Sequence, residues 1–288
     1  MDTVPIRLGL TLWSHNHWLN SFYGKGTKPA ERLEKYAAVF NTVEGNTTFY
    51  ATPSSQTVDA WNRSTPEDFK FTFKLPSSIT HQNQLRNCQG LLHEFLSVME
   101  PLFSKIGQWT IQLPASFSPE HLSALITFCE MMPKEVKLGV EVRHQGFFAK
   151  DENEKAFNHW LIEKEINRII MDSRPVFSAA PTSEAVIDAH KKKPKVPVHA
   201  IATAHNPMIR FIGHPDLEEN NAFFTPWLKK LPLWVAEGKQ PYLMIHTPDN
   251  IEAPELALAL HRQLQTQCPL PKLPDFPANS DQQQLDMF

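Results

Sequence analysis

Charged and polar side chains stand at or near the ends of eight short apolar runs, and these side chains are the ones in the chain best suited to chemistry. Carboxylates and imidazoles exchange protons, so they are the candidates for general acid–base catalysis. The expected catalytic residues are Glu44, Glu141, Asp172 and His246. The expected ligand-binding residues are Trp13, Asn46, Lys74, His81, Gln112, Arg143 and Arg210.

The charges in this set allow two interpretations. Lys74, Arg143 and Arg210 could clamp a phosphate or carboxylate group of a ligand. Glu44 or Glu141, with a raised pKa, would then act as the general acid or base. The three acids and three bases could instead neutralise one another in a structural ion-pair network, because buried charges persist when they are paired.

The eight apolar runs must be strands that position these residues, since helix-like stretches follow most of them. Eight alternating strand–helix units predict a single TIM-type (β/α)₈ barrel, an α/β fold with its active site at the carboxyl ends of the strands. The expected strands are Arg7–Trp13, Thr42–Asn46, Lys70–Lys74, Trp109–Leu113, Lys137–Arg143, Asn167–Asp172, Ile209–Gly213 and Tyr242–His246.

Strand alternation predicts which of these side chains point into the barrel. In the run 137–143, Leu138 and Val140 belong to an apolar set that should face the helices, so Glu141 and Arg143 should face inward. The same alternation predicts that Lys74 faces inward. It also predicts that the members of three pairs share one side of their strand: Glu44 and Asn46, Thr110 and Gln112, and Thr11 and Trp13.

The sixth unit is irregular, with a long connection over residues 173–208 and a short helix expected near Ser183–Lys191. It contains the basic run Lys191–Lys195, which is either a solvated turn or part of a functional lid.

Composition indicates a cytoplasmic globular protein. The chain has 288 residues and a net charge of −3, so charge alone does not favour nucleic acid. Three isolated cysteines fit a reducing compartment, and no apolar run is long enough to predict membrane insertion. No cofactor is predicted and no zinc motif is present, but a single Mg²⁺ or Mn²⁺ bound by the acidic residues or His246 remains open.

Several segments resemble the YecE-like family, domain of unknown function 72. They are VEGNTTFYATPS at 43–54, FKFTFKLPSSITH at 69–81, IGQWTIQLPASF at 106–117, GVEVRH at 139–144, MDSRP at 171–175, KKKPKVPVHA at 191–200, IRFIG at 209–213 and PYLMIHTPD at 241–249. The resemblance covers nearly the whole chain and implies a TIM-type barrel, without supplying an activity. Ile212 stands where the broader family usually has a histidine.

The composition changes at Pro269, which divides the chain into a barrel at 1–268 and a flexible Pro-rich tail at 269–288. The tail ends in a sequence that resembles the peptides by which bacterial polymerases and repair proteins bind the sliding clamp. The expected partner-binding residues are Gln284, Leu285, Met287 and Phe288.

Three functions follow as hypotheses. The first is a phosphoesterase acting on nucleic acid and recruited by the sliding clamp. The second is an isomerase, lyase or hydrolase acting on a phosphorylated or carboxylated metabolite. The third is a non-catalytic adaptor that binds the clamp. A basic groove across the barrel top would favour the phosphoesterase. A closed anion pocket would favour the enzyme acting on a metabolite. A rim in which every charge is paired, without a cavity, would favour the adaptor.

Overall fold

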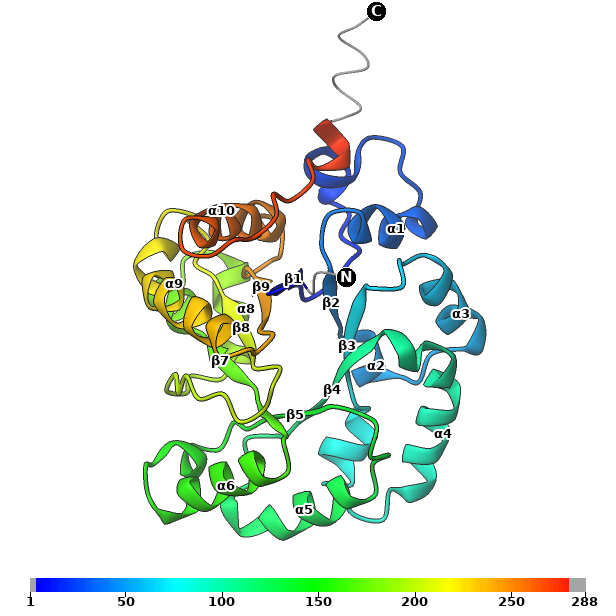
Figure 1. Ribbon diagram of the computed structural model, residues 1–288, viewed down its shortest axis with the longest axis vertical. Helices are drawn as coiled ribbons and strands as arrows, with labels where there is room; N and C mark the ends of the chain where they lie inside the picture. The colour runs from blue at the N-terminus through cyan, green and yellow to red at the C-terminus, as the bar shows by residue number, and fades with distance from the viewer. Residues whose placement is uncertain (1–3, 280–288) are drawn as a thin grey trace, which may run out of the picture.

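A computed structural model describes residues 4–279, and its strands form one parallel sheet curved into a ring (Figure 1). The strands are β1 (Arg7–Leu10), β2 (Thr42–Gly45), β3 (Lys70–Lys74), β4 (Ile106–Gln112), β5 (Leu138–Glu141), β6 (Asn167–Arg168), β7 (Ile170–Asp172), β8 (Met208–Ile212) and β9 (Tyr242–His246). All eight predicted runs are confirmed as strands, and the TIM-type barrel is therefore the observed fold.

The ring closes through the sixth predicted strand, which is interrupted at Ile169. Its first half, β6, pairs with β5, and its second half, β7, pairs with β8. The order around the sheet is β6-β5-β4-β3-β2-β1-β9-β8-β7, so β6 and β7 are the two ends of the sheet. Only the backbone of Ile169 joins these ends, and its N–H donates to the carbonyl oxygen of Val140.

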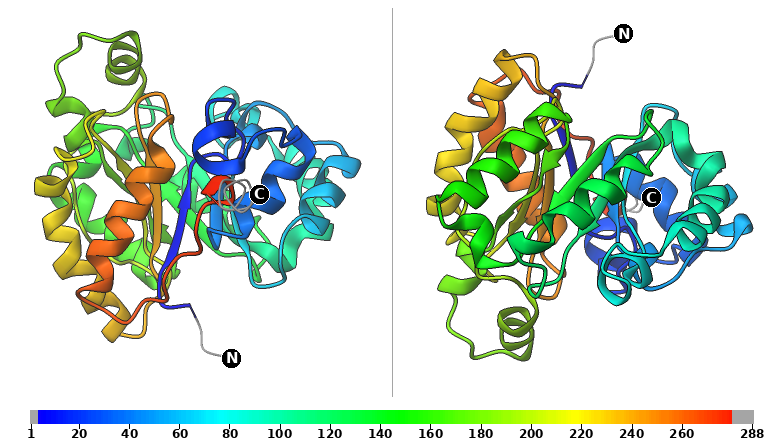
Figure 2. Two further views of the ribbon diagram at one scale, coloured as in Figure 1. Left: turned by 90° about the horizontal axis from the view of Figure 1, so that it is seen from above. Right: turned by 90° about the horizontal axis from the view of Figure 1, so that it is seen from below.

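Helices pack around the outside of the ring (Figures 1 and 2). They are α1 (Arg32–Ala37), α2 (Thr47–Tyr50), α3 (Ser55–Arg63), α4 (Gln89–Met99), α5 (Leu122–Glu130), α6 (Glu152–Glu163), α7 (Arg174–Ser178), α8 (Glu184–Lys192), α9 (Asn220–Ala236) and α10 (Ala253–Gln265). Short 3₁₀ or π turns occupy Leu19–Tyr23, Pro29–Glu31, Ser78–Gln82, Glu100–Lys105, Pro119–His121 and Gln145–Phe148. None of the helices among residues 4–279 is long and apolar enough to cross a membrane.

Side-chain alternation separates two kinds of core. Outward-facing residues such as Phe71, Phe73 and Val140 are buried against the helices in the main apolar cluster. A separate apolar cluster fills the interior near the amino ends of the strands and consists of Ile169, Met208, Tyr242 and Met244. A Cβ on Gly107 would lie 2.3 Å from the Tyr242 hydroxyl oxygen, so this position has room only for glycine. The interior changes to polar and charged side chains toward the carboxyl ends.

The long sixth connection stands over the carboxyl end of the ring. Its helices α7 and α8 project beyond the strands, on the side away from where the chain enters β1 (Figure 2). The predicted helix at 183–191 is confirmed as α8, and its N-cap Ser183 accepts a hydrogen bond from the Val186 N–H. Residues 193–207 return to β8 without regular secondary structure.

The first part of the Pro-rich tail is packed rather than free. Residues 269–276 are irregular, as expected for an extended segment, but Phe276 is 5% exposed and belongs to the main apolar cluster. Its ring contacts Phe22 edge to face, with the centroids 4.9 Å apart. An aromatic side chain therefore anchors this first part of the tail beside the turn Leu19–Tyr23.

Candidate functional site

The inward-facing side chains at the carboxyl ends of five strands form one buried polar cluster. It contains Glu44 from β2, Lys74 from β3, Glu141 from β5, Arg210 from β8 and His246 from β9. Each is less than a tenth exposed. Strand alternation in the sequence predicts the inward direction of Glu44, Lys74 and Glu141, whereas Arg210 and His246 were expected here only from their places at strand ends.

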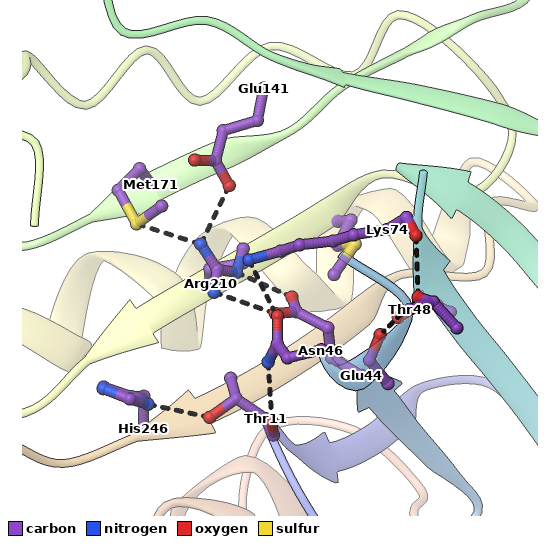
Figure 3. Close-up of polar contacts among 12 residues, drawn as sticks. Thr11, Glu44, Asn46, Thr48, Lys74, Glu141, Met171, Arg210 and His246 are labelled. Carbon is purple, nitrogen blue, oxygen red and sulfur yellow. Dashed lines mark hydrogen bonds and ion pairs between the residues drawn. The ribbon is translucent and has the colours of Figure 1, made fainter. Parts of the chain in front are cut away.

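Arg210 lies at the centre of this cluster and binds both glutamates (Figure 3). Its Nε and Nη2 donate to the two carboxylate oxygens of Glu44, over 2.7 and 2.8 Å. Its Nη1 donates to Oε2 of Glu141 over 2.8 Å. Such a two-oxygen contact fixes the plane of the guanidinium and makes strong, directional hydrogen bonds.

Two further cations complete the pairing of the carboxylates. Nε of Arg143 donates to Oε1 of Glu141 over 2.8 Å, and Nη2 of Arg143 lies 2.7 Å from the same oxygen. Nζ of Lys74 lies 3.5 Å from Oε1 of Glu44. Each glutamate is therefore paired with two cations, and an ion-pair network of the kind expected from the sequence joins Glu44 and Glu141 to Lys74, Arg143 and Arg210.

This pairing rules out the raised glutamate pKa that was expected from the sequence. Burial by itself would raise the pKa of Glu44, but Arg210 and Lys74 outweigh burial and hold it below its usual value. Burial is likewise outweighed at Glu141, whose pKa is lowered by Arg143, Arg210 and Lys74. Both carboxylates are ionised at neutral pH, so neither is a general acid in this arrangement.

Lys193 is a functional candidate that sequence reasoning missed. It follows α8 in the loop above the ring and lies near enough to Arg210, Lys74, Glu44 and Glu141 to feel their charges. Burial, followed by the neighbouring cations, lowers its pKa to about 7. Burial and Arg210 similarly lower the pKa of Lys74 to about 8. The only sequence signal was the basic run 191–195, which more often marks a solvated turn.

Three buried polar atoms around the cluster have no hydrogen-bond partner within the described chain. They are Nε2 of His246, Oε1 of Gln112 and Oδ1 of Asn46. The Asn46 amide nitrogen donates to the Thr11 carbonyl oxygen, and Nδ1 of His246 lies 2.7 Å from the Thr11 hydroxyl. Burial, followed by Lys193 and Arg210, lowers the pKa of His246 well below its usual value, so this imidazole is neutral. Unpaired buried polar atoms are costly, so these three atoms are available to hydrogen-bond a ligand.

An open groove adjoins the cluster and has a volume of about 600 Å³. Its lining contains several basic side chains and no carboxylate. The lining residues are His81, Pro114, Ala115, Arg143, His144, Gln145, Lys191, Lys192, Lys193, Pro194, Lys195 and Val196. Arg143 and Lys193 belong to both the groove and the charged cluster, and together the groove and the cluster are here called the barrel mouth.

Asp172 and Trp13 do not join the barrel mouth. Asp172 is fully buried and faces the helices, where it accepts hydrogen bonds from Arg174 and from Trp227 of α9. Its neighbour Met171 faces inward and contacts Arg210, so alternation turns Asp172 outward. The Trp13 ring packs against Trp61 of α3, because β1 ends at Leu10 and its alternation does not extend to residue 13.

Two expectations concern metals and the tail. No group of three or more metal-binding His, Cys, Asp or Glu side chains occurs in residues 4–279. The acidic residues named for Mg²⁺ or Mn²⁺ are instead paired with arginine or lysine. The expected clamp-binding residues Gln284, Leu285, Met287 and Phe288 lie outside the described residues.

Known sequences resemble this chain along nearly its whole length. The family model described as "Protein of unknown function DUF72" matches residues 7–280. The UPF0759 protein YecE of Escherichia coli strain K12 is 48% identical over 280 residues, which cover 97% of this chain and 99% of that protein. The UPF0759 protein YunF of Bacillus subtilis strain 168 is 23% identical over 193 residues, or 65% of this chain and 67% of that protein.

Solved structures share the fold. A crystal structure of a DUF72 family protein from Enterococcus faecalis V583 superposes with a TM-score of 0.71 at 20% identity, covering 94% of this chain and all of that one. A DUF72 family protein from Thermotoga maritima MSB8 gives a TM-score of 0.69 at 24% identity, with 90% and 99% covered. At these identities the structures establish the barrel and say nothing about a reaction.

Proposed function

Because the chain belongs to the DUF72 family of proteins of unknown function, we propose its function from the barrel mouth alone: it binds a small ligand that bears a phosphate or carboxylate group. The observation that carries this proposal is an excess of positive charge. Lys74, Arg143, Lys193 and Arg210 bring four cations, and Glu44 and Glu141 bring two carboxylates. An excess of two positive charges remains when Lys193 is protonated, and an anion would neutralise it.

Arg143 and Lys193 are the residues positioned to hold that anion. Glu141 occupies Nε and Nη2 of Arg143, which leaves Nη1 of this partly exposed guanidinium for the groove. Lys193 has no ion pair among residues 4–279, and it lines the same groove. A planar guanidinium beside an ammonium is a common arrangement for phosphate and carboxylate groups.

The groove has the size of a small-molecule site. Such sites usually occupy about 300–1,000 Å³ and combine a few convergent polar groups with a largely preformed wall. Arg143, Gln145 and Lys193 supply those polar groups in the lining of the groove. Glu44 and Glu141 act here as positioning residues, since their ionised carboxylates hold Arg210 and Arg143 in place.

A nucleic-acid strand is a second candidate, because the outer wall of the groove carries the exposed Lys191 and Lys195. Phosphate backbones bind such basic walls with a strong dependence on salt. The clamp-binding sequence of the tail would deliver the protein to DNA under this hypothesis, as a phosphoesterase or as an adaptor. The two candidates differ in the length of ligand that they require.

Thermal unfolding with and without anions tests the proposal. A ligand at one hundred times its Kd stabilises a protein by about 2.7 kcal/mol, so phosphate, pyrophosphate or citrate should raise the Tm by several degrees. The Arg143→Gln and Lys193→Gln variants should lose this rise. Lys239→Gln is the matched control, because it removes one positive charge near the start of β9, far along the chain from the mouth.

Equal Tm shifts in all four proteins, or no shift in any of them, would refute anion binding at the mouth. An oligonucleotide that stabilises the protein when small anions do not, with an effect that disappears as salt rises, would favour the nucleic-acid candidate instead.

A further inference from the structure

Two hydrogen bonds hold the loop that carries Lys193 over the barrel mouth. The hydroxyl of the buried Ser173, directly after β7, donates to the carbonyl oxygen of Pro194 over 2.8 Å. The side-chain amide of Gln145, which follows β5, donates to the carbonyl oxygen of Lys195 over 3.1 Å. The backbone on the carboxyl side of Lys193 is therefore fixed at two places, and its side chain is directed to a defined position.

At that position the Lys193 amine meets cations and finds no counterion. Arg210 and Lys74 are its strongest charged neighbours. The carboxylates of Glu44 and Glu141 lie nearby but are already occupied by Arg210, Arg143 and Lys74. A lysine surrounded in this way favours the neutral amine, which is the nucleophilic form, and burial together with these cations sets its pKa at about 7.

We propose that Lys193 is a nucleophile that forms an imine with the aldehyde or ketone group of an anionic ligand bound in the groove. This inference rests on the proposed anion binding and specifies the ligand as a carbonyl compound that bears phosphate or carboxylate. Arg143 would hold the anionic group, and the carbonyl carbon would then face Nζ of Lys193.

The chemistry is balanced without any oxidant or further reactant. The Nζ lone pair attacks the carbonyl carbon, a C–N bond forms, and the carbonyl π electrons move to oxygen. Proton transfer from nitrogen to that oxygen gives a neutral carbinolamine. Its hydroxyl then leaves as water while the second N–H proton is lost, and the C=N bond of the imine forms.

His246 is placed to carry a proton in these steps. Burial lowers the pKa of His246 and the charge of Lys193 lowers it further, so the imidazole is neutral and can take up a proton. When Nδ1 donates to the Thr11 hydroxyl, Nε2 has a free lone pair, and it is one of the buried atoms without a partner in the described chain. A neutral imidazole of this kind accepts a proton from the attacking amine.

Lys74 is the competing amine, and its contacts make it the weaker candidate. Its Nζ lies 3.5 Å from the Glu44 carboxylate and 5.9 Å from the centre of the Phe49 ring. Both contacts stabilise the charged ammonium form, which is not nucleophilic.

Borohydride trapping of the full-length protein tests the imine. The protein is incubated near pH 7.5 with pyridoxal 5′-phosphate, or separately with glyoxylate, then reduced and mapped by peptide mass spectrometry. An ordinary lysine is only about 0.1% uncharged at this pH, so Lys193 should be modified at least tenfold faster than surface lysines. Excess inorganic phosphate should slow the modification, and one equivalent should be incorporated.

The Lys193→Arg variant should lose this adduct, and the matched Lys239→Arg variant should keep it. Modification at Lys74, or spread evenly over surface lysines, would overturn the assignment to Lys193. Anion-dependent stabilisation without any trapped adduct would refute the imine and leave the proposed function intact, whereas loss of both would refute both.

Discussion

We expect the Arg210→Met substitution to lower the free energy of unfolding by about 4 kcal/mol at neutral pH. Methionine is an unbranched, flexible and uncharged replacement, and at this position it would lie beside Met171, whose sulfur is 3.9 Å from Nη1 of Arg210. The substitution removes two hydrogen bonds from Glu44 and one from Glu141. Two buried carboxylates are then left with fewer positive partners.

The size of this loss in unfolding free energy follows from the ion pairs that each carboxylate keeps in the variant. Removing one partner of a buried ion pair usually costs about 3–5 kcal/mol. Glu141 keeps both contacts to Arg143, so its share is small, while Glu44 keeps only Lys74 at 3.5 Å. We therefore assign most of the loss to Glu44. A loss of about 4 kcal/mol corresponds to a fall in Tm of roughly 10 °C for a domain of this size.

The loss should depend on pH in a definite direction. In the native protein the pKa of Glu44 is lowered, so its pairing stabilises the fold above the unfolded pKa and is lost as pH falls through the folded pKa. In the variant, burial without Arg210 raises the Glu44 pKa above its unfolded value. The carboxyl group then becomes protonated on mild acidification, and the stability gap between the two proteins should narrow from about pH 7.5 to pH 5.

Urea unfolding followed by tryptophan fluorescence at these two pH values measures the gap. The double variant Arg210→Met/Glu44→Gln removes the stranded charge and should recover at least half of the loss, which completes a double-mutant cycle. Arg262→Met, at an exposed position of α10, is the control. A variant as stable as the native protein, or a gap that is equal at both pH values, would refute this account of the cluster.

Three further outcomes are expected. Glu141→Gln should lower the free energy of unfolding by roughly 2–4 kcal/mol in urea unfolding, and should weaken anion binding in calorimetry, because Arg143 and Arg210 lose the carboxylate that holds them; unchanged or tighter binding would count against the positioning role of Glu141. Phe276→Ala should cost about 3 kcal/mol and make the tail sensitive to protease, and a tail equally resistant in both proteins would contradict its anchoring role. A labelled peptide of residues 279–288 should bind a purified bacterial sliding clamp in fluorescence polarisation, and replacing Leu285 and Phe288 by alanine should abolish binding.

The barrel could be predicted from the sequence because its strands are short apolar runs separated by helical patterns. Two of the runs, Lys70–Lys74 and Tyr242–His246, have the observed bounds. The inward direction of Glu44, Lys74 and Glu141 also followed, since alternation along a strand is a local property. Their pairing did not follow, because it depends on how neighbouring strands are staggered.

Asp172 shows where that local reasoning stopped. It ends its strand, as the other candidates do, but a place at a strand end does not by itself tell which way the side chain points. Arg168 and Ile170 face the helices there, and Asp172 follows the same direction. The lowered pKa values of Glu44 and Glu141 could not be predicted from the sequence for a different reason. The sequence shows that acids and bases are present, but only the structure shows that Arg210 touches two acids at once.

Lys193 was missed because its position is set by distant residues. Nothing in the run of lysines distinguishes it in the sequence from Lys191, Lys192 and Lys195, all three of which are exposed. Its direction comes from Ser173 and Gln145, which hold the following backbone from two separate strand ends.

The interruption at Ile169 leaves β5 and β7 unpaired with each other at the carboxyl end of the ring, and the loop that carries Lys193 connects them. One anchor of this loop, Ser173, directly follows β7, and the other, Gln145, follows β5, which pairs with β6. Moving β7 away from β5 would break no hydrogen bond between paired strands, since β5 pairs with β6 and β7 pairs with β8. The movement would instead stretch the loop that carries Lys193, because Ser173 and Gln145 hold it from both sides. Widening of the barrel mouth and displacement of the Lys193 amine are therefore the same movement. A ligand too large for the groove would move that amine away from Arg210 as it enters.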